Sequence, residues 1–425
     1  MQNYKKRIAD AQLERRLKTK GAVLIQGPKW CGKTTTAEQI AKSVLYMSDP
    51  EKKEQNLSLA DINPGILLSG DVPRLIDEWQ IAPKLWDAIR FEVDHRETPE
   101  GQFILTGSAV PANMEDVTHT GTGRFGWLTM RPMSLFESEE STGTVSLSSL
   151  FNNAPELGSE NPRSLQDIAY LCCRGGWPRS IFVDKDYALD EAFDYYEAVV
   201  ESDVSKVDGV NRNPERVKKL MRSYARNIGT QASNETLKDD IAKNDSSTLN
   251  SDTVLSYINA LKKIFVVEES AAWNPNLRSK AAIRTSETRY FVDPSIATAA
   301  LGLGPDDLIN DLNTFGFIFE NLCLRDLRVY AEGLGGNVYH YRDSSGLECD
   351  AVVHLRNGSY GLVEIKLGGD RLIEEGVKNL TELSNKIDNN KMKKPSFMMI
   401  LTANSQYAYQ REDGILVVPI GCLKD

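Results

Sequence analysis

The sequence predicts a multidomain α/β protein, and three observations lead to that expectation. The chain has 425 residues, which is enough for two to four domains of about 100–200 residues each. Near the N-terminus, an apolar strand pattern runs into a glycine-containing loop and then into a helix. Near the C-terminus, two strand patterns flank an Asn-Gly turn, and amphipathic helices occupy the region between.

Composition limits the class of protein. Apolar residues make up 41% of the chain, but they form no run of 18 residues, so we expect no transmembrane helix. The first residues lack the apolar stretch of a signal peptide. The six cysteines and four histidines are scattered, which disfavours a zinc site or a disulfide framework. We therefore expect a cytoplasmic enzyme of bacterial type with reduced thiols and no membrane partner.

The charge is uneven along the chain. The net charge is −10, which disfavours general nucleic-acid binding. Residues 212–289, however, contain 14 Lys/Arg and 9 Asp/Glu, a local charge of +5, so the remainder carries −15. This asymmetry indicates a local anionic partner, such as DNA.

The first motif is a phosphate-binding loop between a strand at 22–26 and a helix from 34 onward. It fits the pattern GxxxxGK[ST], in which backbone N–H groups surround the phosphates, Lys33 contacts the β/γ-phosphates and Thr34 joins the Mg²⁺ shell. The strand–loop–helix context makes a chance match improbable. The expected cofactors are ATP and Mg²⁺, and the expected cofactor-binding residues are Gly27, Pro28, Lys29, Trp30, Cys31, Gly32, Lys33, Thr34 and Thr35.

The partner motif is an apolar strand that ends in Asp77-Glu78. Asp77 is expected to hold Mg²⁺ through water, and Glu78 to orient or deprotonate the attacking water. A third strand ends at Thr106, whose hydroxyl either senses the γ-phosphate or serves turn structure. Arg124 is our first candidate for an arginine finger that reaches a neighbouring subunit, and Arg131 is the second; an ion-paired or solvated arginine is the alternative.

Residues 213–303 predict three helices and a two-strand ribbon, the elements of a winged-helix domain. The first helix has Asn213 as N-cap and Pro214 at its first position, and basic residues lie away from its apolar stripe. The third helix starts at Ser251. The residues expected to face inward there are Val254, Leu255, Ile258 and Leu261, and the expected strands are 265–267 and 289–292. DNA contact through the basic residues Arg216, Lys219, Arg222 and Arg226, or through the third helix, is weighed against a purely protein-packing role.

The C-terminal stretch LECDAVVHLRNGSYGLVEIKLG predicts a hairpin with two possible registers. A two-residue turn would set acidic residues opposite apolar ones. A three-residue loop with Gly358 in the left-handed region instead places Leu355 opposite Ser359, Asp350 opposite Glu364 and Glu348 opposite Lys366. The second register leaves one face without charge, so we prefer it.

Paired carboxylates at this spacing suit Mg²⁺, and the order of Asp350, Glu364 and Lys366 resembles the PD-(D/E)xK nuclease motif, with cysteine in place of its proline. Lys366 is the expected catalytic residue beside metal ligands Asp350 and Glu364. Glu320, on a helix upstream, resembles the further acidic ligand of such sites. A solvated charged face is the simpler alternative.

Five stretches together resemble the prokaryotic AAA-type ATPases that carry a C-terminal nuclease-like domain of unknown function: GPKWCGKTTTA, PRLIDEWQIAPKLWDAIR, GQFILTGSA, GRFGWLTMRPMSLFE and GGWP. The resemblance implies a P-loop AAA-type ATPase core with a helical lid, followed by the winged helix and a restriction-endonuclease-like α/β domain. The expected boundaries are 1–137 for the core, 138–205 for a flexible linker and the lid, 206–303 for the winged helix and 304–425 for the nuclease-like domain.

Two functions follow from these expectations. The first is an ATP-hydrolysing enzyme that forms homo-oligomers and acts on DNA through the winged helix and a metal-dependent nuclease-like domain. The alternative is a nucleotide-dependent regulatory or scaffolding switch whose nuclease fold is inactive. The intact acidic residues favour the first function, and the acidic overall charge favours the second.

Overall fold

The structure is a computed structural model that describes residues 4–107, 121–207, 209–242, 251–275 and 286–425. The chain forms two compact units. The first comprises residues 1–132, 199–212 and 257–266, and the second comprises 133–198, 213–256 and 267–425. No helix among the described residues is long and apolar enough to span a membrane.

The first unit is built on a five-stranded parallel sheet with the strand order β2-β3-β4-β1-β5. Its strands are β1 (Ala22–Gln26), β2 (Ser43–Tyr46), β3 (Arg74–Asp77), β4 (Phe103–Gly107) and β5 (Phe125–Thr129). Its helices are α1 (Ile8–Leu17), α2 (Lys33–Glu38), α3 (Lys53–Ile62), α4 (Pro64–Leu68), α5 (Leu85–His95) and α10 (Val204–Lys206), with a π-helical turn η3 (Val199–Asp203). The three strands expected around the phosphate loop and its partner motifs are confirmed.

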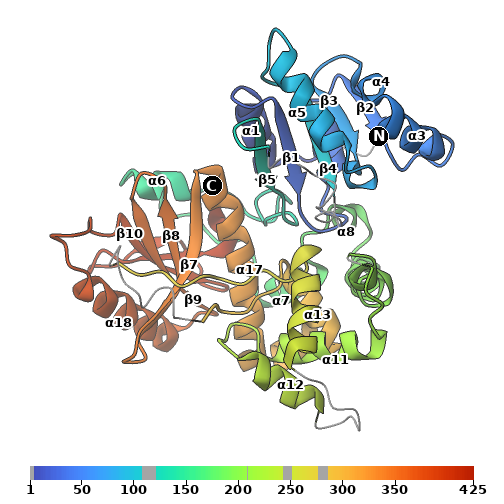
Figure 1. Cartoon of the computed structure of the whole chain (residues 1–425). Coiled ribbons are helices and arrows are strands. Elements are labelled where there is room, and N and C mark those ends of the chain that lie inside the picture. The colour runs from blue at the N-terminus through green and yellow to red at the C-terminus, as the bar shows by residue number, and fades with distance from the viewer. Residues whose placement is uncertain (1–3, 108–120, 208, 243–250, 276–285) are drawn as a thin grey trace. The chain divides into compact units, whose positions relative to one another are not determined.

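Both faces of this sheet are covered. Alternate residues of β1 enter different cores: Leu24 packs with Trp86 of α5, whereas Val23 and Ile25 pack with Leu13 of α1. A parallel strand buried on both faces reads as a continuous apolar run, which explains the uninterrupted AVLI sequence. Figure 1 shows α1 and α5 flanking these strands.

The second unit combines helices with a six-stranded mixed sheet in the order β11-β12-β10-β9-β8-β7. Its strands are β6 (Val145–Ser146), β7 (Gly336–Arg342), β8 (Glu348–Leu355), β9 (Tyr360–Lys366), β10 (Phe397–Thr402), β11 (Tyr409–Gln410), β12 (Leu416–Pro419) and β13 (Leu423–Lys424). Its helices are α6 (Leu147–Phe151), α7 (Leu165–Arg174), α8 (Pro178–Phe182), α9 (Asp190–Ala198), α11 (Pro214–Arg226), α12 (Asn234–Ala242), α15 (Pro294–Leu301), α16 (Pro305–Asn310), α17 (Leu312–Gly333) and α18 (Asp370–Lys386). The sequence of α13 (Ser251–Lys263) belongs partly to each unit.

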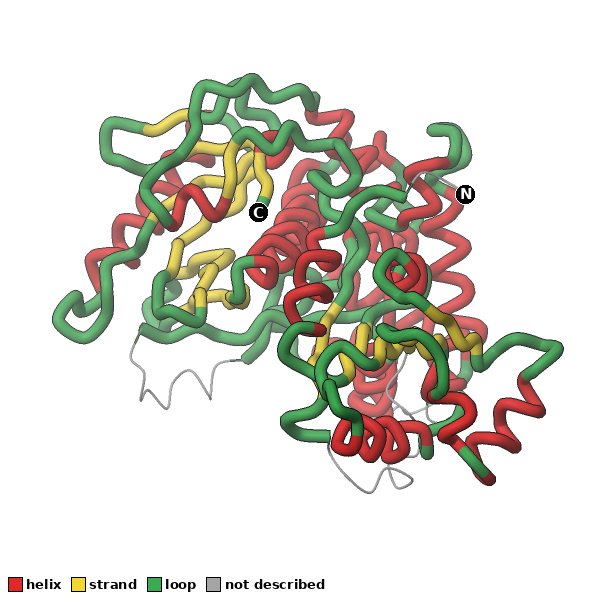
Figure 2. Tube along the Cα trace, turned by 90° about the horizontal axis from the view of Figure 1, so that it is seen from above, coloured by secondary structure: helices red, strands yellow, loops and turns green. Residues whose placement is uncertain are grey.

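Two helices pack on the mixed sheet. Helix α17 contacts β7, β8 and β9, and α18 contacts β8, β9 and β10. Figure 1 shows α17 and α18 beside the strands of this sheet, and Figure 2 shows helical and strand segments of the chain from a second side. The apolar residues of α18 that face the sheet, including Ile373 and Leu380, are buried with Val352 and Leu362. A mixed sheet covered in this way can bury charged as well as apolar side chains.

A buried ionic cluster joins α17 to the turn containing GGWP. Arg325 is 1% exposed and donates to Asp293 at 2.9 Å and to Asp326 at 2.9 and 2.7 Å. Asp293 also accepts from the backbone N–H of Gly176. A Cβ on Gly175, whose φ is +73°, would lie 2.4 Å from the Ser295 hydroxyl, so the glycine allows this close approach.

The segment from 138 to 163 differs from the expected flexible linker. Strand β6 pairs with β13, and the Ser141 hydroxyl donates to the carbonyl of Leu423. The Asn161 amide donates to the carbonyls of Ala403 and Ser405. Local composition could not show this, because the partners of the segment lie more than 240 residues later in the chain.

The three helices expected after residue 213 are present. The Asn213 side chain caps α11 by accepting from the N–H of Arg216, as predicted. Val254, Ile258 and Leu261 of α13 are buried, as predicted, but Leu255 is 43% exposed, so the prediction that it faces inward is wrong. The expected two-strand ribbon is reduced to isolated bridges at Val267–Phe291 and Ser270–Thr288. The winged-helix assignment remains a prediction.

Candidate nucleotide site and acidic centre

The loop between β1 and α2 has the backbone of a phosphate cradle. Gly27 has φ +152°, and a Cβ there would lie 2.0 Å from the carbonyl oxygen of Met130. Gly32 has φ +95° and precedes the first residue of α2. Only glycine takes both positions without strain. With glycine at both, the loop can turn tightly and bring its N–H groups and the helix N-terminus together where the parallel strands end.

The polar side chains of this edge converge on Asp77. One carboxylate oxygen of Asp77 accepts from the Thr34 hydroxyl at 2.7 Å and from the Thr106 hydroxyl at 2.6 Å. Lys33 is 7% exposed and donates to the carbonyls of Gly27 and Pro28 at 3.0 and 2.7 Å. The ends of β3 and β4 and the start of α2 thus place an acid, two hydroxyls and an ammonium group together.

Glu78 lies directly beyond β3 in the left-handed region, with φ +56°. Its carboxylate accepts a hydrogen bond from the Gln80 amide. Burial, and then the negative charge of Asp77, raise the pKa of Glu78, while the charges of Lys33 and Lys29 oppose the increase. A carboxyl group with a raised pKa beside a phosphate loop has the properties of a general base.

Two further contacts tether the loop within the first unit. The Arg7 guanidinium donates to the carbonyl of Cys31 at 2.9 Å and to that of Arg131 at 2.8 Å. The Lys29 ammonium lies 2.6 Å from the carboxylate of Asp203, in η3. Trp30, between these tethers, is 49% exposed. Thr35 is also exposed, and its carbonyl accepts from Gln39.

The two finger candidates lie at opposite ends of β5: Arg124 precedes the strand, and Arg131 follows it on the side of the phosphate loop. Arg131 is buried beside the phosphate loop of its own chain, where Arg7 contacts its carbonyl. Arg124 directly precedes β5, which pairs with β1 from Ala22↔Phe125 to Gln26↔Thr129. At about 3.3 Å per residue, a five-residue strand separates Arg124 from the loop edge by roughly 16 Å.

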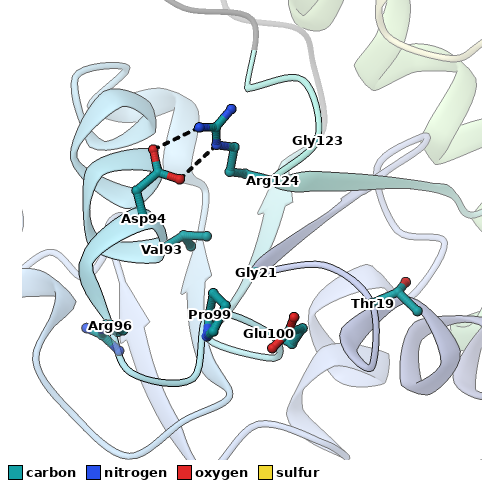
Figure 3. A pocket seen from close by; sticks show the side chains of 9 residues that line it. All are labelled: Thr19, Gly21, Val93, Asp94, Arg96, Pro99, Glu100, Gly123 and Arg124. Atoms are coloured by element: carbon teal, nitrogen blue, oxygen red, sulfur yellow. Dashed lines mark hydrogen bonds and ion pairs between the residues drawn. The ribbon is translucent and has the colours of Figure 1, made fainter.

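Arg124 lines a cavity of about 410 Å³ at the edge opposite the phosphate loop (Figure 3). Its guanidinium forms a two-bond ion pair with Asp94 at 2.8 and 3.1 Å, and its side chain is 44% exposed. Gly21, Arg96 and Glu100 also line the cavity. In its own chain, Arg124 therefore points to a surface cavity and not to the nucleotide loop.

The C-terminal hairpin has the bulged register. The β8–β9 pairs run from His354↔Tyr360 to Ala351↔Val363, the N–H of Leu355 donates to the carbonyl of Ser359, and Gly358 has φ +82°. This part of the prediction is confirmed. The β8–β9 pairs end at Ala351↔Val363, so the expected pairing of Glu348 with Lys366 stays a prediction; on its other side, Glu348 pairs with Arg342 of β7 at 2.8 Å.

The charged face of the hairpin forms a partly buried centre. The Lys366 ammonium lies 2.7 Å from Glu364 and 3.2 Å from Asp350. Glu364 is 1% exposed, and burial raises its pKa to about 8. A Cβ on Gly376 would lie 3.3 Å from the Cβ of Glu364, so this glycine allows α18 to cover the carboxylate. A solvated charged face, the simpler alternative, is therefore excluded for Glu364.

Glu320 of α17 belongs to the same centre. It accepts a hydrogen bond from the Tyr290 hydroxyl. Burial and then the charge of Asp350 raise the pKa of Glu320 well above its ordinary value. The structure thus brings together Glu320, Asp350, Glu364 and Lys366, all of which were selected from sequence.

The donor chemistry of both sites suits a hard cation. Thr34 and Asp77 supply oxygen atoms at the phosphate loop. In the acidic centre, the Oε1 atom of Glu364 is buried and has no hydrogen-bond partner among the described residues, as a ligand atom would. Within those same residues, no group of three or more His, Cys, Asp or Glu side chains is arranged to hold a metal ion. Asp350 and Glu364 could supply at most a two-carboxylate site, with Lys366 between them.

Helix α11 presents two exposed arginines. Arg222 and Arg226 line a cavity of about 350 Å³ together with Ile228 and Phe317. Asp307 and Asp311 line the same cavity, so its charge is mixed. Arg216 and Lys219 are half-buried on the same helix.

Sequence reasoning missed three side chains of these sites. Asp203 pairs with Lys29 across 174 positions, Tyr290 donates to Glu320, and Asn379 donates to Glu364 at 3.4 Å. None lies in a local motif. One signal was available: an isolated glycine within a helical pattern, here Gly376, often marks a close approach between elements.

Comparisons with known proteins divide the chain into three parts. Residues 19–139 match the family described as AAA domain. Residues 165–307 match a domain of unknown function, DUF8612, and residues 315–423 match another, DUF4143. Uncharacterized proteins of Mycobacterium tuberculosis and Mycobacterium bovis are each 27% identical over 368 residues, which is 85% of this chain and 74% of the relative.

Solved structures with similarity to the chain include P-loop ATPases. The Walker-type ATPase PABY2304 of Pyrococcus abyssi matches with a TM-score of 0.43 and 14% identity, covering 69% of this chain and 94% of the other. The RuvB Holliday junction branch migration motor of Thermotoga maritima matches with a TM-score of 0.27 and 17% identity, covering 62% and 88%. The AAA domain match and the geometry at Lys33 and Asp77 together support an AAA-type ATPase-like core in residues 19–139.

Proposed function

We propose that the chain binds and hydrolyses ATP with Mg²⁺ and uses this reaction to act on DNA. The observation that carries the ATPase part is the convergence of Thr34 and Thr106 on one oxygen of Asp77, beside Lys33. Strand, loop and helix place these groups where parallel strands end, which is where α/β sheets bind ligands.

The residues of this edge divide the work. The loop N–H groups and Lys33 bind the phosphates, and Thr34 and Asp77 would hold Mg²⁺, which neutralises phosphate charge when bound. Glu78 accepts the proton of the attacking water or orients it. Thr106 holds Asp77 in place and lies where a γ-phosphate could be sensed.

Arg124 completes the site of a neighbouring copy in this proposal. Its position before β5 prevents it from reaching the loop of its own chain, and its exposed guanidinium faces a surface cavity. A homo-oligomer in which this edge of one copy faces the phosphate loop of the next would supply an arginine finger in trans.

The DNA-directed part rests on the second unit. Residues 206–303 would serve as the winged-helix domain, with Arg222 and Arg226 as exposed phosphate contacts. Residues 304–425 would serve as a PD-(D/E)xK nuclease-like domain, in which Asp350 and Glu364 hold a divalent metal ion near Glu320. The buried Oε1 of Glu364 supports that assignment.

A second function is supported by a specific contact. The Lys366 ammonium forms ion pairs with both Asp350 and Glu364, so the lysine itself neutralises the carboxylates that a metal would need. A stably neutralised centre suits a nucleotide-dependent regulatory or scaffolding switch with an inactive nuclease fold. Binding of Mn²⁺ by the wild-type protein, lost in Asp350→Asn but retained in Glu348→Gln, would favour the enzyme.

The ATPase proposal is tested by two variants measured side by side. Lys33→Ala should abolish ATP binding, because the loop loses its phosphate-directed cation. Glu78→Gln should bind ATP normally but lose turnover by about 10²–10⁴-fold, the typical contribution of a positioned base. Glu54→Gln, an equal change of charge at an exposed position of α3, is the matched control and should keep both. Turnover in Glu78→Gln close to that of the wild type would place the base elsewhere.

A further inference from the structure

The ion pair between Lys29 and Asp203 joins the phosphate loop to a helical segment far away in sequence. The Nζ atom lies 2.6 Å from the Asp203 carboxylate; the lysine side chain is 46% exposed and the aspartate side chain 11%. Because the lysine side chain is partly exposed, it is accessible to a competing anion at the loop.

Asp203 ends an unusual piece of helix. Residues 199–203 form the π-helical turn η3, which follows α9 and precedes the three-residue α10 without a break. π-Helical turns are rare and occur frequently at functional sites. α9 is counted with the second unit and η3 with the first, so the chain passes from one unit to the other within this helical run.

Lys29 lies between Gly27 and Gly32, inside the loop whose N–H groups surround phosphates. A bound nucleotide would bring several negative charges to the loop, and they would compete with the single Asp203 carboxylate for the lysine. An almost buried carboxylate that loses its cation is costly, because burial disfavours an unpaired charge. The field of Lys29 also reaches Glu78, whose pKa is raised by burial and lowered in part by Lys33 and Lys29.

We propose that Lys29 and Asp203 form a nucleotide-sensitive latch: ATP draws Lys29 to its phosphates, the pair with Asp203 opens, and residues 199–206 loosen. Asp203 thus regulates the ATPase site and passes its nucleotide state to the helical run that continues from α9. The inference rests on ATP binding at the loop and goes beyond hydrolysis.

Two measurements on the full chain test the latch. The first is the affinity for a fluorescent ATP analogue with Mg²⁺. Asp203→Asn keeps the shape of the side chain but frees Lys29 and removes a competing charge, so it should bind the analogue about tenfold more tightly. Glu197→Gln, an equal change of charge at an exposed position of α9, should bind as the wild type does.

The second measurement is amide hydrogen exchange of residues 199–206 with and without ATP. In the wild type, ATP should speed exchange there. In Asp203→Asn, and also in Lys29→Met, exchange should already be fast and independent of ATP, although Lys29→Met binds ATP more weakly. The Lys29→Met protein keeps Asp203, so it tests the latch even if the other variant is poorly folded.

The outcomes separate two failures. A wild-type protein that binds no ATP analogue would overturn the ATPase proposal itself. Normal ATP binding with ATP-independent exchange at 199–206, or an affinity of Asp203→Asn equal to or weaker than that of the wild type, would overturn the latch while leaving the ATPase proposal in place.

Discussion

Arg124 offers a sharp test, because its geometry predicts that two inactive proteins restore activity when mixed. Arg124→Ala removes the finger but leaves its own nucleotide site intact. Glu78→Gln removes the base but leaves its finger intact. Each protein alone should lose turnover, by about 10³–10⁵-fold for an arginine finger.

The expected recovery follows from the sheet. Arg124 lies at the end of the sheet opposite the phosphate loop, so in the proposed oligomer it would act on the site of a neighbour. In an equal mixture, half of the subunits are Arg124→Ala, and half of their neighbours present an intact finger. About one quarter of the sites should then be complete, giving about a quarter of wild-type turnover in a head-to-tail oligomer.

The assay is steady-state phosphate release after the proteins are mixed and allowed to exchange subunits. A mixture of Glu78→Gln with Lys33→Ala is the control: both defects lie in the same nucleotide site, so no recovery is expected. Full activity of Arg124→Ala alone, or a mixture that stays inactive despite subunit exchange, would refute the trans finger and leave Arg124 with its contacts to Asp94 and the carbonyl of Thr122.

Three further results are expected. Arg325→Leu leaves Asp293 and Asp326 buried without their cation, so urea unfolding should show a loss of about 3–5 kcal/mol. Arg411→Leu, which breaks surface ion pairs with Glu374 and Asp413, should cost about 1 kcal/mol or less, and equal losses would contradict the buried cluster. Gly358→Val should lower the unfolding free energy by about 1–2 kcal/mol because of its positive φ, whereas Gly358→Asn should be nearly neutral; a neutral valine would exclude strain at the bulge. Charge reversal at Arg222 and Arg226 should weaken duplex DNA binding and flatten its salt dependence, and Arg371→Glu on α18 should not; unchanged DNA affinity would indicate a protein partner instead.

The sequence predicted local geometry well. The GxxxxGK[ST] pattern between a strand and a helix predicts the phosphate loop, and its glycines Gly27 and Gly32 adopt positive φ, which other residues resist. The hairpin register followed from keeping charge off one face and from the need for a positive φ at Gly358. In both cases the constraint lies within a few residues, so the sequence pattern contains it.

The sequence did not predict how distant segments meet. The partners of Lys29 and Glu320 are Asp203 and Tyr290, which lie in no motif and are brought close only by tertiary packing. The burial of Glu364 was missed for the same reason. The alternation of charged and apolar residues along β9 alone indicates a solvated face there, but α18 covers that face. Leu255 shows the opposite error, because an apolar residue beside a buried stripe can still face solvent.

The central claim is that ATP turnover at Lys33, Asp77 and Glu78 serves an action on DNA. It is tested most directly by the rate of ATP hydrolysis with and without duplex DNA at low salt, for the wild type and for the protein with Arg222 and Arg226 reversed in charge. The account predicts that DNA stimulates the wild type and that the reversed protein keeps its basal rate but responds less. A wild-type protein that hydrolyses ATP at the same rate with and without DNA would contradict it and favour the regulatory switch.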